Sequence, residues 1–246
     1  AAGGPWRRFG PGGGRLGGFT GPEVPHDVIG LGRRTAGPSS SPPRSSGSGA
    51  SPIPRPTKNV FCLGRNYAEH VREATRARGQ DFKLPTHPIF FSKTPNTVVG
   101  PYDDVVWDAR VTKQVDWEAE LGLIIGVGGI NIGRAEALAH VFGYTVINDV
   151  SARDVQKDHM QFFKGKSLDT FCPMGPWLVT ADACDGTNTQ VRCWVNGEER
   201  QNASTRDLIF DIPTLIETLS AGITLYPGDV IATGTPVGVG IGFKPP

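Results

Sequence analysis

Two glutamates, two residues apart, are the first candidates for chemistry in this sequence. Glu118 and Glu120 stand in the segment Trp117–Ile125, where polar and apolar residues alternate. The alternation predicts a strand with both carboxylates on one face. Two acids at this spacing repel each other unless water solvates them or a cation bridges them, and carboxylate oxygens suit a hard cation such as Mg²⁺. The pair alone leaves a solvated strand face and a metal site both open.

Asp149 adds a third candidate ligand. It ends the apolar segment YTVIND, residues 144–149, which predicts a buried strand. An unpaired carboxylate in such surroundings is costly, so Asp149 needs a partner. Three carboxylates on strands form the donor set of an octahedral metal site with open positions. Spacing alone does not show whether the three side chains meet.

His70 and Glu73 are a candidate catalytic pair. They lie three residues apart on a helix expected at residues 67–77, and therefore on one face of it. A carboxylate beside an imidazole fixes the tautomer of the ring and raises its basicity, which suits a general base acting on water. An exposed pair on the helix surface is the alternative interpretation.

A lysine and a glycine-rich segment complete the set. Lys166 is flanked by apolar residues in FFKGKSLDTF, so its ammonium group must find an anion or lose its proton, and a structural and a catalytic role are both open. Gly234–Gly240 follows a predicted strand and could bind an anion through backbone amides. It lacks the Gly-Lys-Ser/Thr of a P-loop, and no helix is expected after it, so the signal for a nucleotide is weak.

Strands outnumber helices among the elements that must position these residues. Strands are expected at residues 59–64, 88–92, 117–125, 144–149, 176–179, 191–196 and 229–233, and helices at 67–77, 135–142 and 212–220. Gly143 is expected to end the second helix, and Asn196-Gly197 predicts a hairpin turn. Because strict alternation of strands and helices and any fixed repeat are missing, the sequence predicts a β-rich α+β fold.

Composition divides the chain near residue 51. Of the first 50 residues, 27 are Gly, Pro or Ser, and 6 are Arg against 2 acids. We expect residues 1–51 to be a disordered, low-complexity segment and residues 52–246 to form one catalytic domain. We expect a cytoplasmic protein, with a mitochondrial location as the alternative if residues 1–50 are a transit peptide.

Charge and hydropathy argue against two classes of partner. The chain has 25 Lys and Arg and 24 acids, which leaves 19 and 22 beyond residue 50, and a mildly acidic body argues against nucleic acid. No apolar run reaches the roughly 18–20 residues that cross a bilayer, so no membrane role is expected. The four cysteines do not have the spacing of metal-binding or redox motifs and are interpreted as small apolar side chains.

Six motifs then occur in a fixed order: GRNYAEH, FFSK, DWEAELGLIIG, INDVSARDVQ, GKSLDTFCPMGPW and ATGTPVGVG. Together, over about residues 54–240, they resemble the fumarylacetoacetate hydrolase family. The resemblance implies a roll of mixed β-sheets around a divalent-metal site that takes Mg²⁺, or Mn²⁺ or Ca²⁺, usually in a homodimer. Relatives continue through further strands after the glycine-rich loop, so we expect the domain to be incomplete at its C-terminus.

The resemblance also implies roles for residues of these motifs. The metal ligands would be Glu118, Glu120 and Asp149. The catalytic residues would be His70 and Glu73, on a lid helix, and Lys166. The oxo-acid end of the substrate would contact Arg153, Gln156 and Thr235. Lys93 of FFSK is a further candidate with no assigned role.

From these roles we expect a hydrolase that cleaves a C–C bond in an acylpyruvate or a related β-diketo acid; the alternative substrates are 2-oxo dicarboxylates of aromatic catabolism. The metal would chelate the 1-carboxylate and 2-oxo oxygens, His70 would activate water, and Lys166 would stabilise the oxyanion. An isomerase, decarboxylase or hydratase acting on a 2-oxo dicarboxylate, or a ureidoglycolate-type lyase, would use the same chelate. A non-enzymatic binding protein is disfavoured because it would have no need of a base. A nicotinamide-dependent oxidoreductase is disfavoured because the sequence has no GxGxxG between a strand and a helix.

Overall fold

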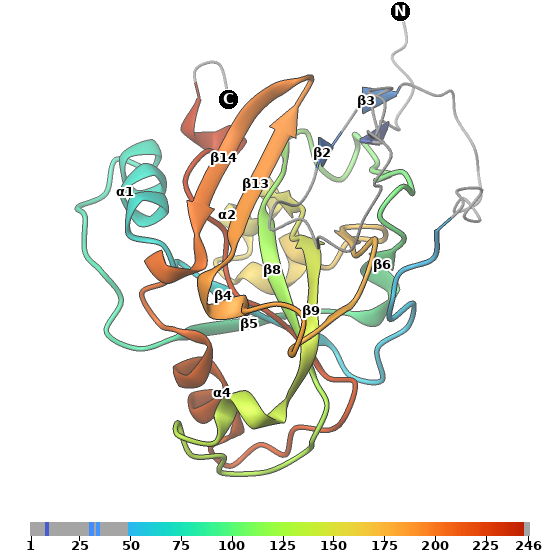
Figure 1. Cartoon of the computed structure of the whole chain (residues 1–246). Helices are drawn as coiled ribbons and strands as arrows, with labels where there is room; N and C mark the ends of the chain where they lie inside the picture. The colour runs from blue at the N-terminus through green and yellow to red at the C-terminus, as the bar shows by residue number, and fades with distance from the viewer. Residues whose placement is uncertain (1–7, 10–29, 32, 35–48, 244–246) are drawn as a thin grey trace, which may run out of the picture.

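A six-stranded mixed sheet organises the protein in the computed structural model, which describes residues 8–9, 30–31, 33–34 and 49–243 (Figure 1). Its strands lie in the order β12-β9-β8-β15-β4-β5. Their bounds are β4 (Val60–Gly64), β5 (Ile89–Lys93), β8 (Ala119–Ile125), β9 (Val141–Asn148), β12 (Val179–Thr180) and β15 (Val230–Ala232). Only β15 and β4 pair in parallel, so the sheet is mixed, as the resemblance implied.

Smaller sheets and short helices surround this sheet. The three-stranded sheet consists of β2 (Gly30–Leu31), β13 (Gln190–Val195) and β14 (Glu198–Ser204). The two-stranded sheets pair β1 (Arg8–Phe9) with β3 (Arg33–Arg34), β6 (Val98–Val99) with β11 (Cys172–Pro173), and β7 (Val115–Asp116) with β10 (Ser151–Ala152). The α-helices are α1 (Ala68–Ala77), α2 (Arg153–Asp158), α3 (Phe162–Lys166) and α4 (Ile212–Ser220).

Five 3₁₀ helices complete the described secondary structure: η1 (Pro95–Thr97), η2 (Ala137–His140), η3 (Gly186–Asn188), η4 (Thr205–Asp207) and η5 (Gly240–Gly242). The predicted β-rich α+β fold is confirmed. In the described part of the chain, no helix is long and apolar enough to span a membrane. The disorder expected for residues 1–51 falls almost wholly outside the described residues.

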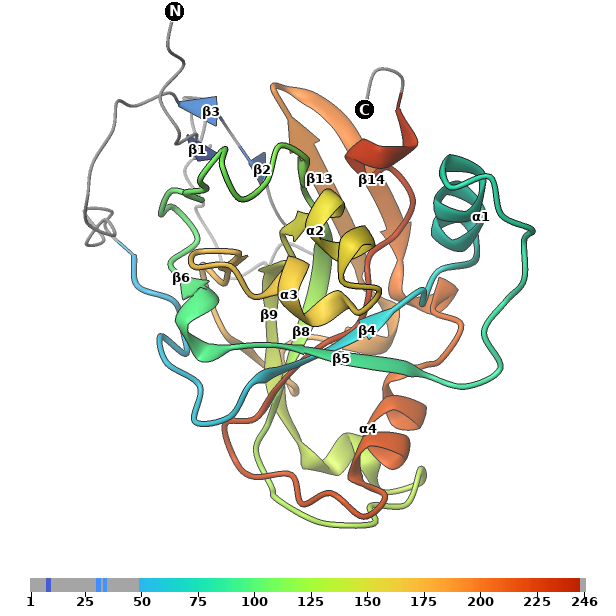
Figure 2. The same ribbon diagram turned by 180° about the vertical axis from the view of Figure 1, so that it is seen from behind.

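Strand β8 is the centre of the core, and all seven of its residues are buried. Leu121, Leu123 and Ile125 pack into the largest apolar cluster together with residues of β13 and α4, as the alternation in the sequence predicted. Ile124 belongs to a second apolar cluster on the other face of the strand. The β13–β14 hairpin therefore covers one face of β8, whereas α2 and α3 lie over the other face (Figures 1 and 2). The acidic residues of this strand are consequently enclosed rather than solvated.

Two predictions about turns and helix ends have different outcomes. Asn196 and Gly197 both adopt positive φ, 55° and 84°, and join β13 to β14 as the predicted hairpin turn. The helix predicted at 135–142 is wrong beyond η2, because the chain enters β9 at Val141. Gly143 does not end a helix but lies within β9, where the Val179 carbonyl of β12 approaches so closely that a Cβ would not fit.

Residues 153–166 form two helices that the sequence did not predict. Helices α2 and α3 are six and five residues long, which is too short for a clear helical period. The strand expected at 176–179 is limited to β12. Helix α4, by contrast, has the predicted bounds, residues 212–220.

The N-cap of α4 explains its sharp beginning. The Asp211 carboxylate accepts a hydrogen bond from the Thr214 amide at 3.1 Å, and Pro213 fills the first turn. Arg134 binds the same carboxylate at 2.7 and 2.5 Å. The hydrogen bonds from Arg134 lower the pKa of Asp211 to about 2. The cap therefore anchors the helix whose Leu215 and Ile216 fill the core.

Removal of this cap should weaken the fold. We expect Asp211→Ala to lower the free energy of unfolding by about 1 kcal/mol at neutral pH, measured by urea denaturation. Asp211→Asn keeps a capping oxygen and loses only the charge, so its effect should be smaller. Because the folded-state pKa lies below the ordinary 3.8, the contribution of the charge is complete above that pH and disappears as the pH falls through about 2. An Asp211→Ala protein as stable as wild type at pH 7 would contradict this role.

Candidate active site

The three candidate metal ligands meet in the fold. Glu118 immediately precedes β8, Glu120 lies on β8, and Asp149 immediately follows β9. These strands are antiparallel with Ala119 opposite Asn148, so the residue before one strand lies beside the residue after the other. One carboxylate oxygen from each acid lies within 4.8 Å of the other two, and all three side chains are buried. The buried acidic triad is thus a product of strand register.

Three cationic side chains surround two members of this triad. Lys166 Nζ lies 2.7 Å from Glu118 Oε2 and 2.7 Å from Asp149 Oδ2. Lys93 Nζ lies 2.7 Å from Asp149 Oδ1, and Arg153 Nη2 lies 2.7 Å from Glu118 Oε1. Burial opposes charge on Lys166, but Asp149 and Glu118 outweigh it and raise its pKa. Lys166 has therefore found its anions and keeps its proton. Burial likewise opposes ionisation of Glu118, but Lys166 and Arg153 outweigh it and hold the pKa of this carboxyl well below its usual range.

Glu120 is the partly compensated member of the triad. Its Oε2 accepts a hydrogen bond from the Gly234 amide at 2.7 Å, but its buried Oε1 has no hydrogen-bond partner in the described structure. Burial, with the nearby charges of Asp149 and Glu118, raises the pKa of Glu120 well above its usual range. Lys166 and the Gly234 amide therefore offset only part of the cost of burying Glu120 beside two other carboxylates.

This donor set fits a divalent cation. A bound cation would give the free Glu120 oxygen a partner and offset the repulsion among the three acids. Lys93 and Lys166 leave lone pairs of these carboxylates available to a metal ion, because each carboxylate oxygen carries two. Hard oxygen ligands match Mg²⁺, Mn²⁺ or Ca²⁺ rather than a metal that prefers thiolates. The triad could thus hold the ion that the sequence suggested.

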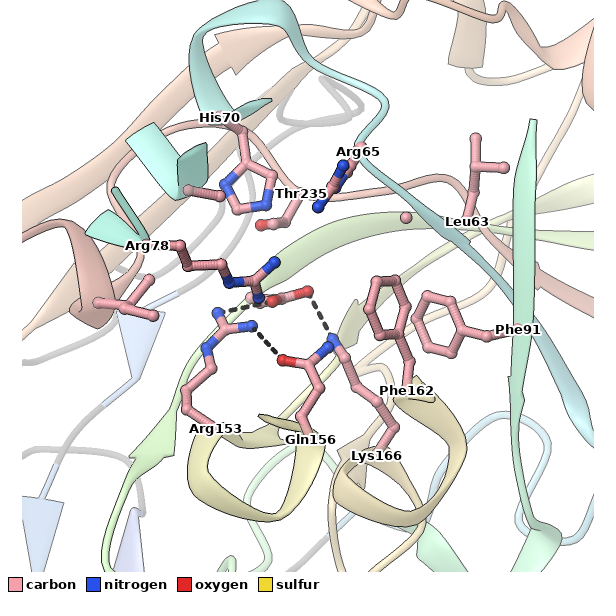
Figure 3. A pocket seen from close by; sticks show the side chains of 14 residues that line it. Leu63, Arg65, His70, Arg78, Phe91, Arg153, Gln156, Phe162, Lys166 and Thr235 are labelled. Atoms are coloured by element: carbon pink, nitrogen blue, oxygen red, sulfur yellow. Dashed lines mark hydrogen bonds and ion pairs between the residues drawn. The ribbon is translucent and has the colours of Figure 1, made fainter. Parts of the chain in front are cut away.

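The candidate base stands on α1. His70 Nδ1 lies 3.4 Å from Glu73 Oε2, and both side chains are buried, so the pair is not the exposed surface pair that the sequence left open. The Gly238 amide donates to both oxygens of Glu73, at 3.1 and 3.2 Å, and so ties α1 to the glycine-rich loop. With Nδ1 facing Glu73, the imidazole ring of His70 points into a pocket (Figure 3). The histidine is therefore positioned to act on a bound molecule.

Six of the nine predicted site residues line this pocket. They are His70 from α1, Glu118, Arg153 and Gln156 from α2, Lys166 from α3, and Thr235 from the glycine-rich loop. The other three do not line it: Glu120 and Asp149 lie beside Glu118 in the triad, and Glu73 contacts Nδ1 of His70. Leu63, Phe91 and Phe162 give one side of the pocket an apolar lining. The lining of the pocket thus combines one carboxylate, that of Glu118, with cationic and apolar side chains.

The glycine-rich loop binds anions, but they are carboxylates of the chain itself. The amides of Gly234, Gly238 and Gly240 donate to Glu120, Glu73 and Asp116, respectively. Gly238 has φ +106°, and a Cβ there would overlap the Arg200 carbonyl, so only glycine fits. These three amides are consequently occupied, which removes the main reason for expecting a phosphate at this loop.

Two polar residues that hold the site together were not identified in the sequence. The Asp116 carboxylate accepts from Arg153 Nε at 2.8 Å and from the Gly240 and Ile241 amides at 2.6 and 3.1 Å. The Gln201 amide group donates to Thr235 Oγ1 at 2.8 Å and accepts from the Ala119 amide at 3.0 Å.

Asp116 stands within the DWEAE motif, so its position gave a signal. Gln201 lies on the second strand of the hairpin, and no pattern marked it. Thr235 in turn donates to the Ala119 carbonyl at 2.9 Å, so its hydroxyl is already engaged within the protein.

Comparison with known proteins agrees with this geometry. Residues 59–246 match the family described as fumarylacetoacetate (FAA) hydrolase C-terminal. Oxaloacetate tautomerase YisK of Bacillus subtilis is 53% identical over 196 residues, which cover 79% of this chain and 64% of the relative. The mitochondrial oxaloacetate tautomerase FAHD2A of Bos taurus is 46% identical over 207 residues, covering 83% of this chain and 63% of the relative. The chain thus spans less than two thirds of the length of these curated relatives.

Solved structures give the same assignment. The fumarylacetoacetate hydrolase of Exiguobacterium antarcticum is similar with a TM-score of 0.70 and 49% identity, covering 80% of this chain and 69% of that chain. The 2-hydroxyhepta-2,4-diene-1,7-dioate isomerase of Mycobacterium marinum has a TM-score of 0.64 and 37% identity, covering 78% and 68%. Since the family match extends over most of the described fold and includes the acidic triad, the chain belongs to the fumarylacetoacetate hydrolase family.

Proposed function

We propose that this protein catalyses keto–enol tautomerisation of a small 2-oxo dicarboxylic acid of the oxaloacetate type, with a divalent cation at the acidic triad. The observation that carries the proposal is the convergence of His70, Lys166 and Glu118 on one pocket. The names of the bacterial and bovine relatives support the reaction type. Mg²⁺ is the proposed cation because all three ligands are carboxylates.

The residues of the pocket can divide the work of such a reaction. A divalent cation, when bound, supplies Lewis-acid stabilisation for the negative charge of an enolate. His70, oriented by Glu73, takes a proton from C3 of the keto acid, and the electrons of the C3–H bond move toward the 2-oxo oxygen. The ammonium of Lys166 stabilises the charge that develops there. Return of the proton from His70 to that oxygen gives the enol, so atoms and charge balance without a co-reactant.

C–C hydrolysis of an acylpyruvate is the second candidate. The observation that favours it is the apolar wall of Leu63, Phe91 and Phe162, which suits an uncharged acyl group. In this reaction His70 would deprotonate a water molecule rather than C3, and a pyruvate enolate would leave. Incubation with oxaloacetate and with an acylpyruvate, followed by NMR identification of the products, distinguishes the two. Formation of pyruvate and a free acid from the acylpyruvate, without accelerated enolisation of oxaloacetate, would favour the hydrolase.

The remaining expectations stay proposals of the same kind. We propose a homodimer on the basis of the family resemblance. We propose a cytoplasmic location, and a mitochondrial location is the alternative that the bovine relative's name supports. Sedimentation velocity and the distribution of the tagged full-length protein in fractionated cells would test them.

Loss of the base should abolish most of the activity. We expect His70→Gln to reduce turnover by about 10²- to 10⁴-fold, because proton transfer at C3 loses its acceptor. Glu73→Gln should cost less, since it removes only the group that orients the ring. The decay of the ultraviolet absorbance of enol-oxaloacetate measures both. His87→Gln alters an exposed histidine outside the pocket and serves as the control. Wild-type turnover in His70→Gln would exclude this residue as the base.

Metal binding should depend on Glu120. In protein freed of metal by EDTA, we expect Mg²⁺ to raise the Tm of wild type but not of Glu120→Gln. Without metal, Glu120→Gln should be at least as stable as wild type, because a buried acid beside Glu118 and Asp149 is replaced by a neutral group. Since the pKa of Glu120 is raised, protons compete with the cation, and Mg²⁺ affinity should increase with pH.

Glu136→Gln is the matched control, because it changes an exposed carboxylate that precedes β9, whereas Asp149 follows the other end of this strand. The measurement is thermal unfolding with and without Mg²⁺. An equal Mg²⁺-induced shift in wild type and Glu120→Gln would show that the cation binds elsewhere.

A further inference from the structure

Two arginines of the pocket have no role in the chemistry described above. Arg65 lies between β4 and α1, and Arg78 is the C-cap residue of α1. Both line the same pocket as His70 and Lys166. Figure 3 shows the guanidinium group of Arg78 in the middle of the pocket, beside that of Arg153, and the side chain of Arg65 near Thr235 on the side of α1. Both side chains therefore face any molecule that is bound in the pocket.

Among the described residues, no carboxylate pairs directly with either of these two arginines. Lys93, Lys166 and Arg153 already contact the ionised carboxylates of the triad. Within residues 49–243, neither Arg65 nor Arg78 forms a salt bridge or a side-chain hydrogen bond, and the one carboxylate that lines the pocket, Glu118, is bound to Lys166 and Arg153. The α1 side of the pocket therefore carries an excess of positive charge.

The electrostatic surroundings of Arg78 are consistent with this excess. Partial burial lowers the pKa of Arg78, the positive charges of Arg153 and Arg65 lower it further, and the negative charge of Glu118 opposes them only in part. A bound anion would relieve this repulsion. The backbone at Arg65 is also unusual, because φ is +59°, in the left-handed region that non-glycine residues rarely adopt. Such conformations persist where the surrounding structure enforces them, frequently at ligand sites.

We infer that Arg65 and Arg78 bind the second carboxylate of a dicarboxylate substrate and thereby select dicarboxylic over uncharged acyl 2-oxo acids. The inference rests on the proposed function, because the oxo-acid end must lie at the acidic triad for the far carboxylate to reach the α1 side. A guanidinium group offers paired N–H donors that match the two oxygens of a carboxylate. An acylpyruvate with a neutral acyl group would leave both arginines without an anion, so these residues favour the tautomerase over the hydrolase.

The test compares binding of two ligands that differ by one carboxylate. Pyruvate and freshly dissolved oxaloacetate share the oxo-acid end, and isothermal titration of the Mg²⁺-loaded full chain gives their affinities. We expect wild type to bind oxaloacetate more tightly, and Arg78→Ala to weaken oxaloacetate about 10- to 100-fold while leaving pyruvate unchanged. Arg65→Ala should act in the same direction, and Arg78→Lys should recover part of the affinity.

Arg76→Ala removes an exposed arginine of the same helix that does not line the pocket, and it should change neither affinity. Equal losses for both ligands in Arg78→Ala, or no loss for oxaloacetate, would overturn the inference. Retained arginine-dependent selectivity in a protein that does not accelerate enolisation would instead refute the proposed reaction and leave the carboxylate site standing. In active protein, Arg78→Ala should raise KM for oxaloacetate more than it lowers kcat.

Discussion

Three carboxylates buried within 4.8 Å of one another impose the constraint on which the rest of the site depends. Like charges at this distance, away from water, are tolerated only if positive groups surround them. The chain supplies these groups from distant segments: Lys93 from β5, Arg153 from α2, Lys166 from α3 and the amides of the glycine-rich loop. Compensation of buried charge thus explains why these elements converge at the ends of β8 and β9.

The positive groups compensate the three carboxylates unequally. Glu118 is held ionised by Lys166 and Arg153, whereas Glu120 retains an unpartnered oxygen that a cation can use. Near α1, Arg65 and Arg78 line the pocket without a carboxylate partner among the described residues. A molecule with an oxo-acid group at one end and a carboxylate at the other complements both sides. This complementarity connects the metal site, the base and the proposed substrate class in one electrostatic arrangement.

Helix α1 couples the two sides. It carries the imidazole of His70 and ends at Arg78, and its Glu73 binds the Gly238 amide of the glycine-rich loop. The same loop binds Glu120 through Gly234 and Asp116 through Gly240. A displacement of α1 would therefore change the position of the base and of the carboxylate-binding arginine together. The loop that resembled an external anion site acts instead as the connector between α1 and the acidic triad.

The sequence by itself determined the elements with strong local signals and supplied the residues that are proposed for the site. Alternation predicted β8, and residues 212–220 were predicted as a helix with the bounds of α4. The ordered motifs indicated the family and all nine site positions. The short helices α2 and α3 were missed because five or six residues carry no readable period, and η2 was predicted too long. Only the tertiary structure decided which acid lacks a partner, that Asp116 and Gln201 brace the site, and that Arg65 and Arg78 face the pocket. Those properties depend on distances between segments far apart in the chain, and no local pattern records them.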